Sequence, residues 1–280
     1  MTGELDKEAR QAEALRGLAG TDLGSQSVTY DERDAILYAI AVGASSTDLD
    51  LVFERDLRIL PTYAMALGLW AVERAGALGA YDSTRSLHVG QRLTIQRRLP
   101  TTGRLDMAGV IGDVWDKGSA ALVQVSVESE YFTANYDIYA VGAGGFGGHR
   151  GPSTSVVVHD EPPEFSLLQP TREDQAALYR LTGDRHPVHI DPVVARASGF
   201  ERPILHGLCT LGIVARAIGA ASGAHPAELS SLTARFTAPV LPGTSLEIHG
   251  WRVGDVRDFV VLDDGSAAIL RGSVEFAGVQ

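Results

Sequence analysis

The stretch Leu181–Pro192, LTGDRHPVHIDP, gathers two aspartates, two histidines and an arginine around two prolines. Asp184 and His189 lie five residues apart, across an irregular turn expected around Pro187. Such a turn can place a carboxylate and an imidazole on opposite sides of one water molecule. Because histidine titrates near neutrality, the pair could take and give protons at working pH. The stretch is therefore a candidate acid–base site.

Two other interpretations fit the same residues. As an ordinary polar loop, the stretch would follow a helix ending at Gly183, with the prolines as stop signals. As a metal site, it would offer imidazole, carboxylate and thiol ligands, but none of the strong zinc spacings occurs. The candidate ligands for that reading are His186, His189, Asp191, His206 and Cys209.

Acid–base chemistry on a carbonyl compound also needs a donor for the oxyanion that develops. The segment Pro203–Leu208, PILHGL, leads into a long apolar run that reads as a buried helix. A backbone N–H at the start of such a helix, aided by the helix dipole, can supply the donor. Gly207 is suited to this place because it lets a bulky group approach bare backbone.

The composition limits the class of protein. The chain has 280 residues, is 45% hydrophobic and 21% charged, and carries a formal net charge of −11, which argues against general nucleic-acid binding. Its single cysteine, Cys209, cannot form an internal disulfide. The charged N-terminus does not resemble a signal peptide, and the apolar run Ala35–Ala44 is too short to cross a bilayer. We expect a soluble cytoplasmic protein without nucleic-acid or membrane partners.

The two halves of the sequence resemble each other. Asp31–Gly43 aligns without gaps on Thr171–Gly183, and both read as helices with acids in the first turn. Leu57–Gly76 echoes Glu201–Ala220, and both read as long helices, apolar on nearly every side and hence buried. Alternating apolar residues then predict several antiparallel strands in each half. This order predicts an α+β fold, with two sheets paired edge to edge.

A glycine-rich run, residues 142–152, divides the halves. It could be a flexible linker, or a turn whose bare backbone approaches a ligand; it lacks the Gly-Lys-Ser/Thr of a phosphate loop. We therefore predict an N-terminal extension (1–24), a first domain (25–141), the glycine-rich junction (142–152) and a second domain (153–280).

The segment Tyr179–Arg216 resembles the signature of the (R)-specific 2-enoyl-CoA hydratases, also called hydratase 2 or MaoC-like dehydratases. Thr29–Ser45 and Gly142–Pro152 are similar to parts of the two-domain members. The resemblance implies a double hot-dog fold, in which two antiparallel sheets each wrap around a long central helix. It also implies reversible hydration of trans-2-enoyl-CoA to (3R)-3-hydroxyacyl-CoA, with no metal or redox cofactor, by a homodimer.

The resemblance also assigns roles. Asp184 and His189 would hold and activate the water, and the backbone N–H of Gly207 would bind the thioester oxygen. His186 stands where the family usually has Asn, a residue that would help orient the water or the pair; this puts rate, pH profile or substrate preference in doubt.

The first half lacks the pair, since Ala44 aligns with Asp184 and Leu49 with His189. The resemblance implies that this half makes room for the acyl chain, which leaves one active site per chain. Coenzyme A carries phosphates, which arginines and bare backbone can bind. The candidates for that contact are Arg150, Gly147, Arg196 and Arg202, although any single arginine could equally be a solvated surface residue.

Three rival functions remain open at this point. A hot-dog thioesterase would use differently placed acids and lacks this motif. An acyl-CoA-binding partner subunit with little or no catalysis is favoured only by His186. A dehydratase acting on carrier-bound acyl groups would need a local basic patch on this acidic chain to receive an acidic carrier.

Overall fold

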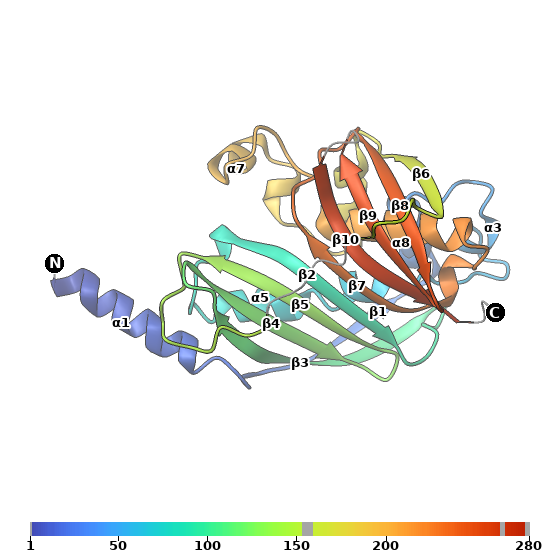
Figure 1. The fold of residues 1–280 in the computed structure, drawn as a ribbon. Coiled ribbons are helices and arrows are strands. Elements are labelled where there is room, and N and C mark those ends of the chain that lie inside the picture. Colours follow the sequence, from blue (N-terminus) through green and yellow to red (C-terminus); the bar gives the residue numbers. More distant parts are fainter. Residues whose placement is uncertain (1, 153–158, 264–266, 278–280) are drawn as a thin grey trace.

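A computed structural model of the chain describes residues 2–152, 159–263 and 267–277, and its two halves repeat one order of elements (Figure 1). After helix α1 (Thr2–Arg16), the first half contains β1 (Asp22–Tyr30), α2 (Glu32–Ala41), α3 (Leu49–Val52), α4 (Tyr63–Leu67), α5 (Trp70–Ala77), η1 (Ser83–Arg85), β2 (Ser86–Ile95), β3 (Gly103–Asp116), β4 (Ala120–Glu128) and β5 (Phe132–Val141). The second half contains β6 (Phe165–Pro170), α6 (Gln175–Tyr179), η2 (Arg180–Thr182), η3 (Pro187–His189), α7 (Pro192–Ala197), α8 (Gly207–Ala221), η4 (Pro226–Glu228), β7 (Leu229–Phe236), β8 (Ser245–Val253), β9 (Val256–Asp263) and β10 (Ala267–Phe276).

The strands form one ten-stranded antiparallel sheet in the order β1-β3-β4-β5-β2-β7-β10-β9-β8-β6. Strands β1, β3, β4, β5 and β2 of the first half correspond to β6, β8, β9, β10 and β7 of the second, so the order is the same from either end of the sheet. The halves meet at β2 and β7, where Gly90 lies opposite Arg235 and Leu93 opposite Leu232. Alternate residues of β4 and β5 are buried, as expected for strands with one face on the core. The predicted α+β double hot-dog fold is confirmed, and its two sheets join edge to edge.

Helix α8 is the central helix of the second half (Figure 1). Eleven of its fifteen residues are buried, which explains why the sequence is apolar on nearly every side. The predicted start at Glu201 is wrong, because the helix begins only at Gly207. The preceding residues are extended: the amide of Leu205 donates to the Val240 carbonyl at 2.7 Å instead of joining a helix.

The long helix predicted over Leu57–Gly76 is also wrong: this segment forms the short helices α4 and α5. The Tyr136 hydroxyl, from β5, donates to the Met65 carbonyl at 2.7 Å, and a Cβ at Gly68 would lie only 2.5 Å from that hydroxyl. The Leu69 amide pairs instead with a carbonyl three residues back, at 3.4 Å. A side chain that occupies a helical acceptor interrupts the helix.

The glycine-rich run is a packed loop in the part that the structure describes. The Asp116 carboxylate, at the end of β3, accepts hydrogen bonds from the amides of Gly145 (2.9 Å) and Gly147 (2.8 Å). These amides and that of Gly118 lower the pKa of Asp116. Phe146 is buried, so the loop is anchored to the β3–β4 turn and is no open linker.

Two of the predicted domain boundaries can be compared with the ends of the elements. Strand β1 begins at Asp22, so the boundary expected after residue 24 lies inside a strand. Leu15 and Leu18, from the predicted extension, are buried in the core. The expected start of the second domain at residue 153 lies outside the described residues, which resume at His159. No helix among the described residues has the length and apolar character needed to cross a membrane.

Candidate active site

The loop between α6 and α7 carries the acid–base pair. Gly183 begins it with φ +148°, and a Cβ there would lie 3.3 Å from the Ala66 carbonyl of α4. The Asp184 carboxylate then accepts a hydrogen bond from the His186 amide at 3.1 Å. The side-chain ligand atoms of Asp184, His189 and His206 all lie within 4.8 Å of one another. The structure thus brings the predicted pair together and adds a second imidazole.

His189 is set up as a neutral base. Its Nδ1 lies 2.9 Å from the Ile204 carbonyl, which can only accept, so Nδ1 carries the proton and Nε2 has the lone pair. Burial lowers the pKa of His189, against the opposing effects of the Asp184 carboxylate and the Ile204 carbonyl. The ring therefore offers a proton acceptor beside a carboxylate at neutral pH.

His206, the residue before α8, packs against both members of the pair. Its ring stacks on that of His189, with centroids 3.7 Å apart and planes 25° apart. Its Nε2–H donates to the Asp184 carbonyl at 3.2 Å, and no described residue partners Nδ1. Burial, followed by the proximity of His189, lowers the pKa of His206 to about 3, so this ring is neutral. The sequence interpretation considered His206 only as a metal ligand, although it directly precedes Gly207.

Because Asp184, His189 and His206 lie close together, they must be considered as ligands of a metal ion. A coordinated ion lies near the plane of each imidazole ring, and stacked rings put their lone pairs in nearly parallel planes. The other candidate ligands are engaged elsewhere: Asp191 caps α7 through the Val193 amide (2.7 Å), and the Cys209 thiol faces the Ala41 carbonyl (3.4 Å). This arrangement favours proton transfer over metal binding.

Gly207 is the first residue of α8, so its amide has no acceptor within the helix. No described residue accepts a hydrogen bond from it. A Cβ at this position would lie 3.1 Å from the Phe236 ring of β7, so the backbone packs closely there. The amide is therefore free to donate to an oxyanion at the positive end of a fifteen-residue helix.

The first half contributes a histidine that the sequence interpretation missed. His88, on β2, has its ring 5.2 Å from that of Phe236 and 5.8 Å from that of Tyr136. Burial lowers the pKa of His88, and Asp184 is among the charges that oppose this shift. His88 could not be found from the sequence because the β2–β7 pairing that brings it here joins residues far apart in the chain.

The remaining predicted site residues lie further out. His186 is exposed, with its ring centroid 6.2 Å from that of His189 and its Nδ1 accepting from the Val188 amide at 3.3 Å. Arg150, Arg196 and Arg202 are exposed as well, and Gly147 is held by Asp116. His186 forms hydrogen bonds with the pair only through its backbone: its amide donates to Asp184, and its carbonyl accepts from the His189 amide at 3.3 Å. No hydrogen bond or ring contact joins the other four residues to Asp184 or His189 in the part of the chain that the structure describes.

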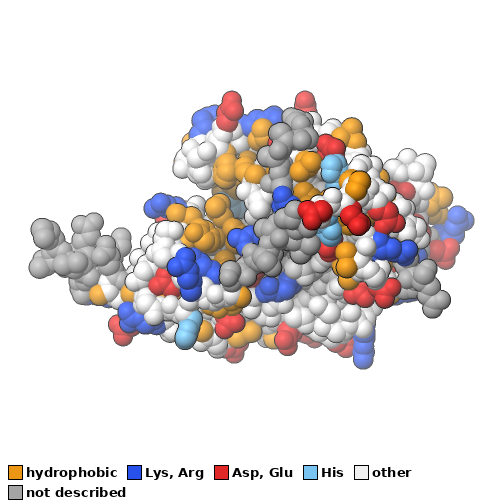
Figure 2. Space-filling view, in the orientation of Figure 1, with side chains coloured by type: hydrophobic (Ala, Val, Ile, Leu, Met, Phe, Trp, Pro, Cys, Tyr) orange, Lys and Arg blue, Asp and Glu red, His pale blue; other side chains and the backbone are white. Residues whose placement is uncertain are grey.

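Apolar side chains flank the pair. Leu181, Ile190 and Val193, on the segment from η2 to α7, are exposed, as is Leu87 on β2. Figure 2 shows hydrophobic side chains on both sides of the hollow between α7 and the N-terminal half. Apolar surface gathered beside the pair is suited to the apolar part of a ligand.

The pH dependence of turnover should reflect the lowered pKa of His189. The base is active when neutral, so kcat/KM should hold as the pH falls to about 6.5 and decline only below this ordinary imidazole value. A profile of kcat/KM from about pH 5 to 8 measures this. An acid limb centred above the ordinary value would contradict the neutral-base assignment.

His206 should act by positioning. His206→Phe keeps a ring to stack but loses the hydrogen bond to Asp184; His206→Ala loses both. We expect kcat to fall about tenfold for Phe and about a hundredfold for Ala, since misplacing reacting groups by about 1 Å costs this much. The acid limb of the pH profile should not move, because the lost ring is neutral. His249→Phe, at a partly buried histidine of β8 paired with Glu247, is the matched control.

Two family profiles cover the chain in tandem. The profile described as MFE-2 hydratase 2 N-terminal domain matches residues 28–143. The profile described as MaoC like domain matches residues 155–265, which include the acid–base pair.

Individual relatives agree with these profiles. The 3-hydroxyacyl-thioester dehydratase Y of Mycobacterium tuberculosis is 37% identical over 276 residues, covering 87% of this chain and 94% of the relative. The peroxisomal multifunctional enzyme type 2 of Mus musculus is 37% identical over 257 residues, covering 85% of this chain but 35% of that enzyme, so the chain spans about a third of its length. Among solved structures, a MaoC-like dehydratase from Phytophthora capsici has a TM-score of 0.83 at 25% identity, covering 94% of this chain and 98% of that one.

Proposed function

Since this chain belongs to the MaoC-like family that includes the hydratase 2 enzymes, we propose that it is an (R)-specific enoyl-CoA hydratase. The reaction adds water across a trans-2-enoyl-CoA to give a (3R)-3-hydroxyacyl-CoA, and runs in both directions. The observation that carries the proposal is the state of His189: its Nδ1 is committed to the Ile204 carbonyl, which leaves Nε2 with the lone pair, and the ring lies within 4.8 Å of the Asp184 carboxylate.

We propose a mechanism in which each proton is accounted for. A water molecule held between Asp184 and His189 attacks C3 with its oxygen as Nε2 of His189 takes one of its protons. The thioester carbonyl becomes an enolate, whose oxygen accepts from the Gly207 amide at the α8 N-terminus. The proton taken up by His189 then passes to the Asp184 carboxylate, which gives it to C2. The product carries the OH of water at C3 and a proton at C2, and both side chains regain their starting states.

The proposal is tested by following loss of enoyl absorbance with purified protein and a ladder of trans-2-enoyl-CoAs from four carbons upward. Chiral analysis of the product should show the (3R) alcohol. A well-folded protein that turns over no rung of the ladder would refute the proposal. The same acyl groups on a carrier protein separate hydratase from carrier-specific dehydratase, because only the thioester carrier changes.

His186→Asn restores the residue usual at this position and should retain or raise kcat. The side chain of His186 is exposed, its contact with the Asp184 carboxylate is made by the backbone amide, which asparagine keeps, and its charge lowers the pKa of His189. Removing that charge should move the acid limb of the pH profile slightly upward. Complete loss of activity in His186→Asn would show instead that this imidazole has a chemical role.

Further features belong to the same proposal. We expect turnover without a metal or redox cofactor, so dialysis against a chelator should leave kcat unchanged. The phosphates of coenzyme A would be bound by exposed arginines, for which Arg150, Arg196 and Arg202 are the candidates, with the backbone at Gly147. The cytoplasmic location and the homodimer remain predictions, the latter tested by light scattering.

A further inference from the structure

The two halves of the molecule are related by an approximate two-fold axis through the β2–β7 pair. The sheet order is the same from either end once corresponding strands are matched. The acid–base pair lies at one end of this strand pair, where β2 begins near His88 and β7 ends at Phe236. Its symmetry-related position lies at the other end, where β2 ends at Ile95 and β7 begins at Leu229. Seven residues of strand, about 23 Å, separate the two ends along β2.

A cavity of about 410 Å³ occupies this second position. It is lined by the loop before α4, by the end of β2 with the residues after it, and by η4 with the start of β7. The loop before α4 corresponds in the repeat to the segment before α8 that approaches His189. The volume falls within the range of small-molecule sites, about 300–1,000 Å³. The duplicated fold thus retains a cavity where a second active site would lie.

The lining combines apolar walls with arginines. Ile59, Ile95 and Leu99 supply part of the wall. Three arginines, at positions 58, 97 and 98, line the cavity against one acid, Glu228. On a chain with a net charge of −11, this is a local excess of positive charge. Such a lining suits a ligand with an anionic head and an apolar body.

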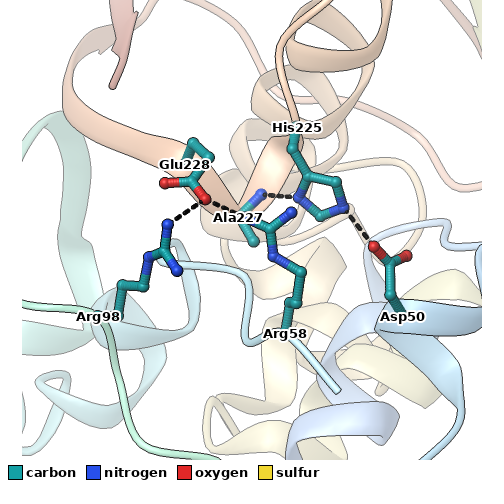
Figure 3. Close-up of polar contacts among 6 residues, drawn as sticks. All are labelled: Asp50, Arg58, Arg98, His225, Ala227 and Glu228. Carbon is teal, nitrogen blue, oxygen red and sulfur yellow. Dashed lines mark hydrogen bonds and ion pairs between the residues drawn. The ribbon is translucent and has the colours of Figure 1, made fainter. Parts of the chain in front are cut away.

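The contacts of Glu228 indicate that the arginines of this cavity bind carboxylates. Its Oε1 accepts from Arg58 and, at 2.5 Å, from Arg98, so two guanidinium groups converge on one carboxylate oxygen (Figure 3). Arg98 keeps 75% of its side chain exposed and retains donors for a further anion. Arg97 lies 3.8 Å from Glu130 and is 69% exposed.

The turn that carries Glu228 is held by contacts between the halves. His225 donates from Nε2 to the Asp50 carboxylate at 2.7 Å and accepts at Nδ1 from the Ala227 amide at 3.1 Å (Figure 3). This fixes η4, and with it the carboxylate of Glu228, against the first half. The carboxylate on which Arg58 and Arg98 converge therefore has a fixed place in the cavity wall.

We propose that this cavity binds a carboxylate with a short or medium apolar body, such as a free fatty acid. The carboxylate joins Arg98 and Arg97 beside Glu228, and the alkyl chain covers the apolar wall. The ligand is bound and not transformed, because the first half has Ala44 and Leu49 where the acid–base pair stands in the second. A second site of this kind lets the chain sense free acid independently of turnover.

Calorimetric titration of the full chain with sodium octanoate tests the proposal. Arg98→Gln should weaken octanoate binding about tenfold or more, since a hydrogen bond to a charged group is lost. Glu228→Gln should strengthen it about tenfold, because the internal competitor for the arginines loses its charge. A cluster that serves only to tie the halves together would not give tighter binding in Glu228→Gln.

Three controls test whether the heat of octanoate binding comes from this cavity. Arg104→Gln, at an exposed arginine of β3 paired with Asp106, should leave the octanoate affinity unchanged. Inorganic phosphate, which has no apolar body, and 1-octanol, which has no charge, should both bind at least tenfold more weakly than octanoate. Phosphate binding as tight as octanoate, unchanged binding in Arg98→Gln, or no octanoate binding to either wild type or Glu228→Gln would overturn the proposal. Calorimetry needs no turnover, so a failure of the hydratase assignment would not alter the result.

Discussion

His189→Gln should lower kcat by on the order of a hundredfold to ten-thousandfold, the contribution of a positioned general base. Glutamine fills similar space and its amide can still donate to the Ile204 carbonyl, which now holds Nδ1 at 2.9 Å. The side chain loses the basic nitrogen that accepts the water proton. The rate of water addition should therefore collapse while the thermal unfolding midpoint stays close to that of the wild type.

Asp184→Asn should have an effect of the same order, for a different reason. The amide can still accept the hydrogen bond from the His186 amide, so the loop is retained. It cannot relay a proton to C2. The carboxylate also raises the pKa of His189, so the residual activity of Asp184→Asn should show an acid limb at lower pH than the wild type.

Both variants are assayed with the best substrate of the enoyl-CoA ladder, by initial rate and by single turnover. Asp191→Asn is the matched control: this carboxylate lies in the same loop but caps α7 through the Val193 amide, and Asn is an equally good cap. Wild-type rates in both His189→Gln and Asp184→Asn would refute the assignment of this pair.

Local sequence patterns predicted the architecture for two reasons. The two halves repeat one order of elements, and apolar residues alternate with polar ones along the strands. Asp31 illustrates how far this reaches: it forms the capping box of α2 with Asp34, as the first-turn acids indicated. Patterns failed where a distant side chain intervened. The break at Gly68 depends on the hydroxyl of Tyr136, about seventy residues further along the chain, and no local propensity encodes it.

The site shows the same division. Asp184, His189 and Gly207 lie in one continuous motif, so their spacing and residue types identified them. His206 was underestimated because its role depends on a ring stack with His189, which the sequence does not specify. His88 comes from the other half and reaches the site only through the β2–β7 register. The motif indicated that Asp184 and His189 would meet, and it did not indicate the neutral, buried His206 beside them.

Gly207→Pro should lower kcat by on the order of a hundredfold to a thousandfold, the usual cost of removing one oxyanion donor. Proline lacks the amide hydrogen that would bind the thioester oxygen. The backbone tolerates the change, because Gly207 is the first helical residue and its amide is unused within the helix. His206, with φ −60° and ψ 133°, already has the extended conformation that precedes proline.

Gly207→Ala separates the donor from the steric effect. Both variants place a Cβ about where it would meet the Phe236 ring at 3.1 Å, but alanine keeps the N–H. We therefore expect a loss of less than about tenfold for alanine, from crowding alone, and the larger loss only for proline. The difference should fall on kcat more than on KM, because the oxyanion develops during the reaction. Equal losses in the two variants would mean that the helix N-terminus provides space for the substrate and that the oxyanion donor lies elsewhere.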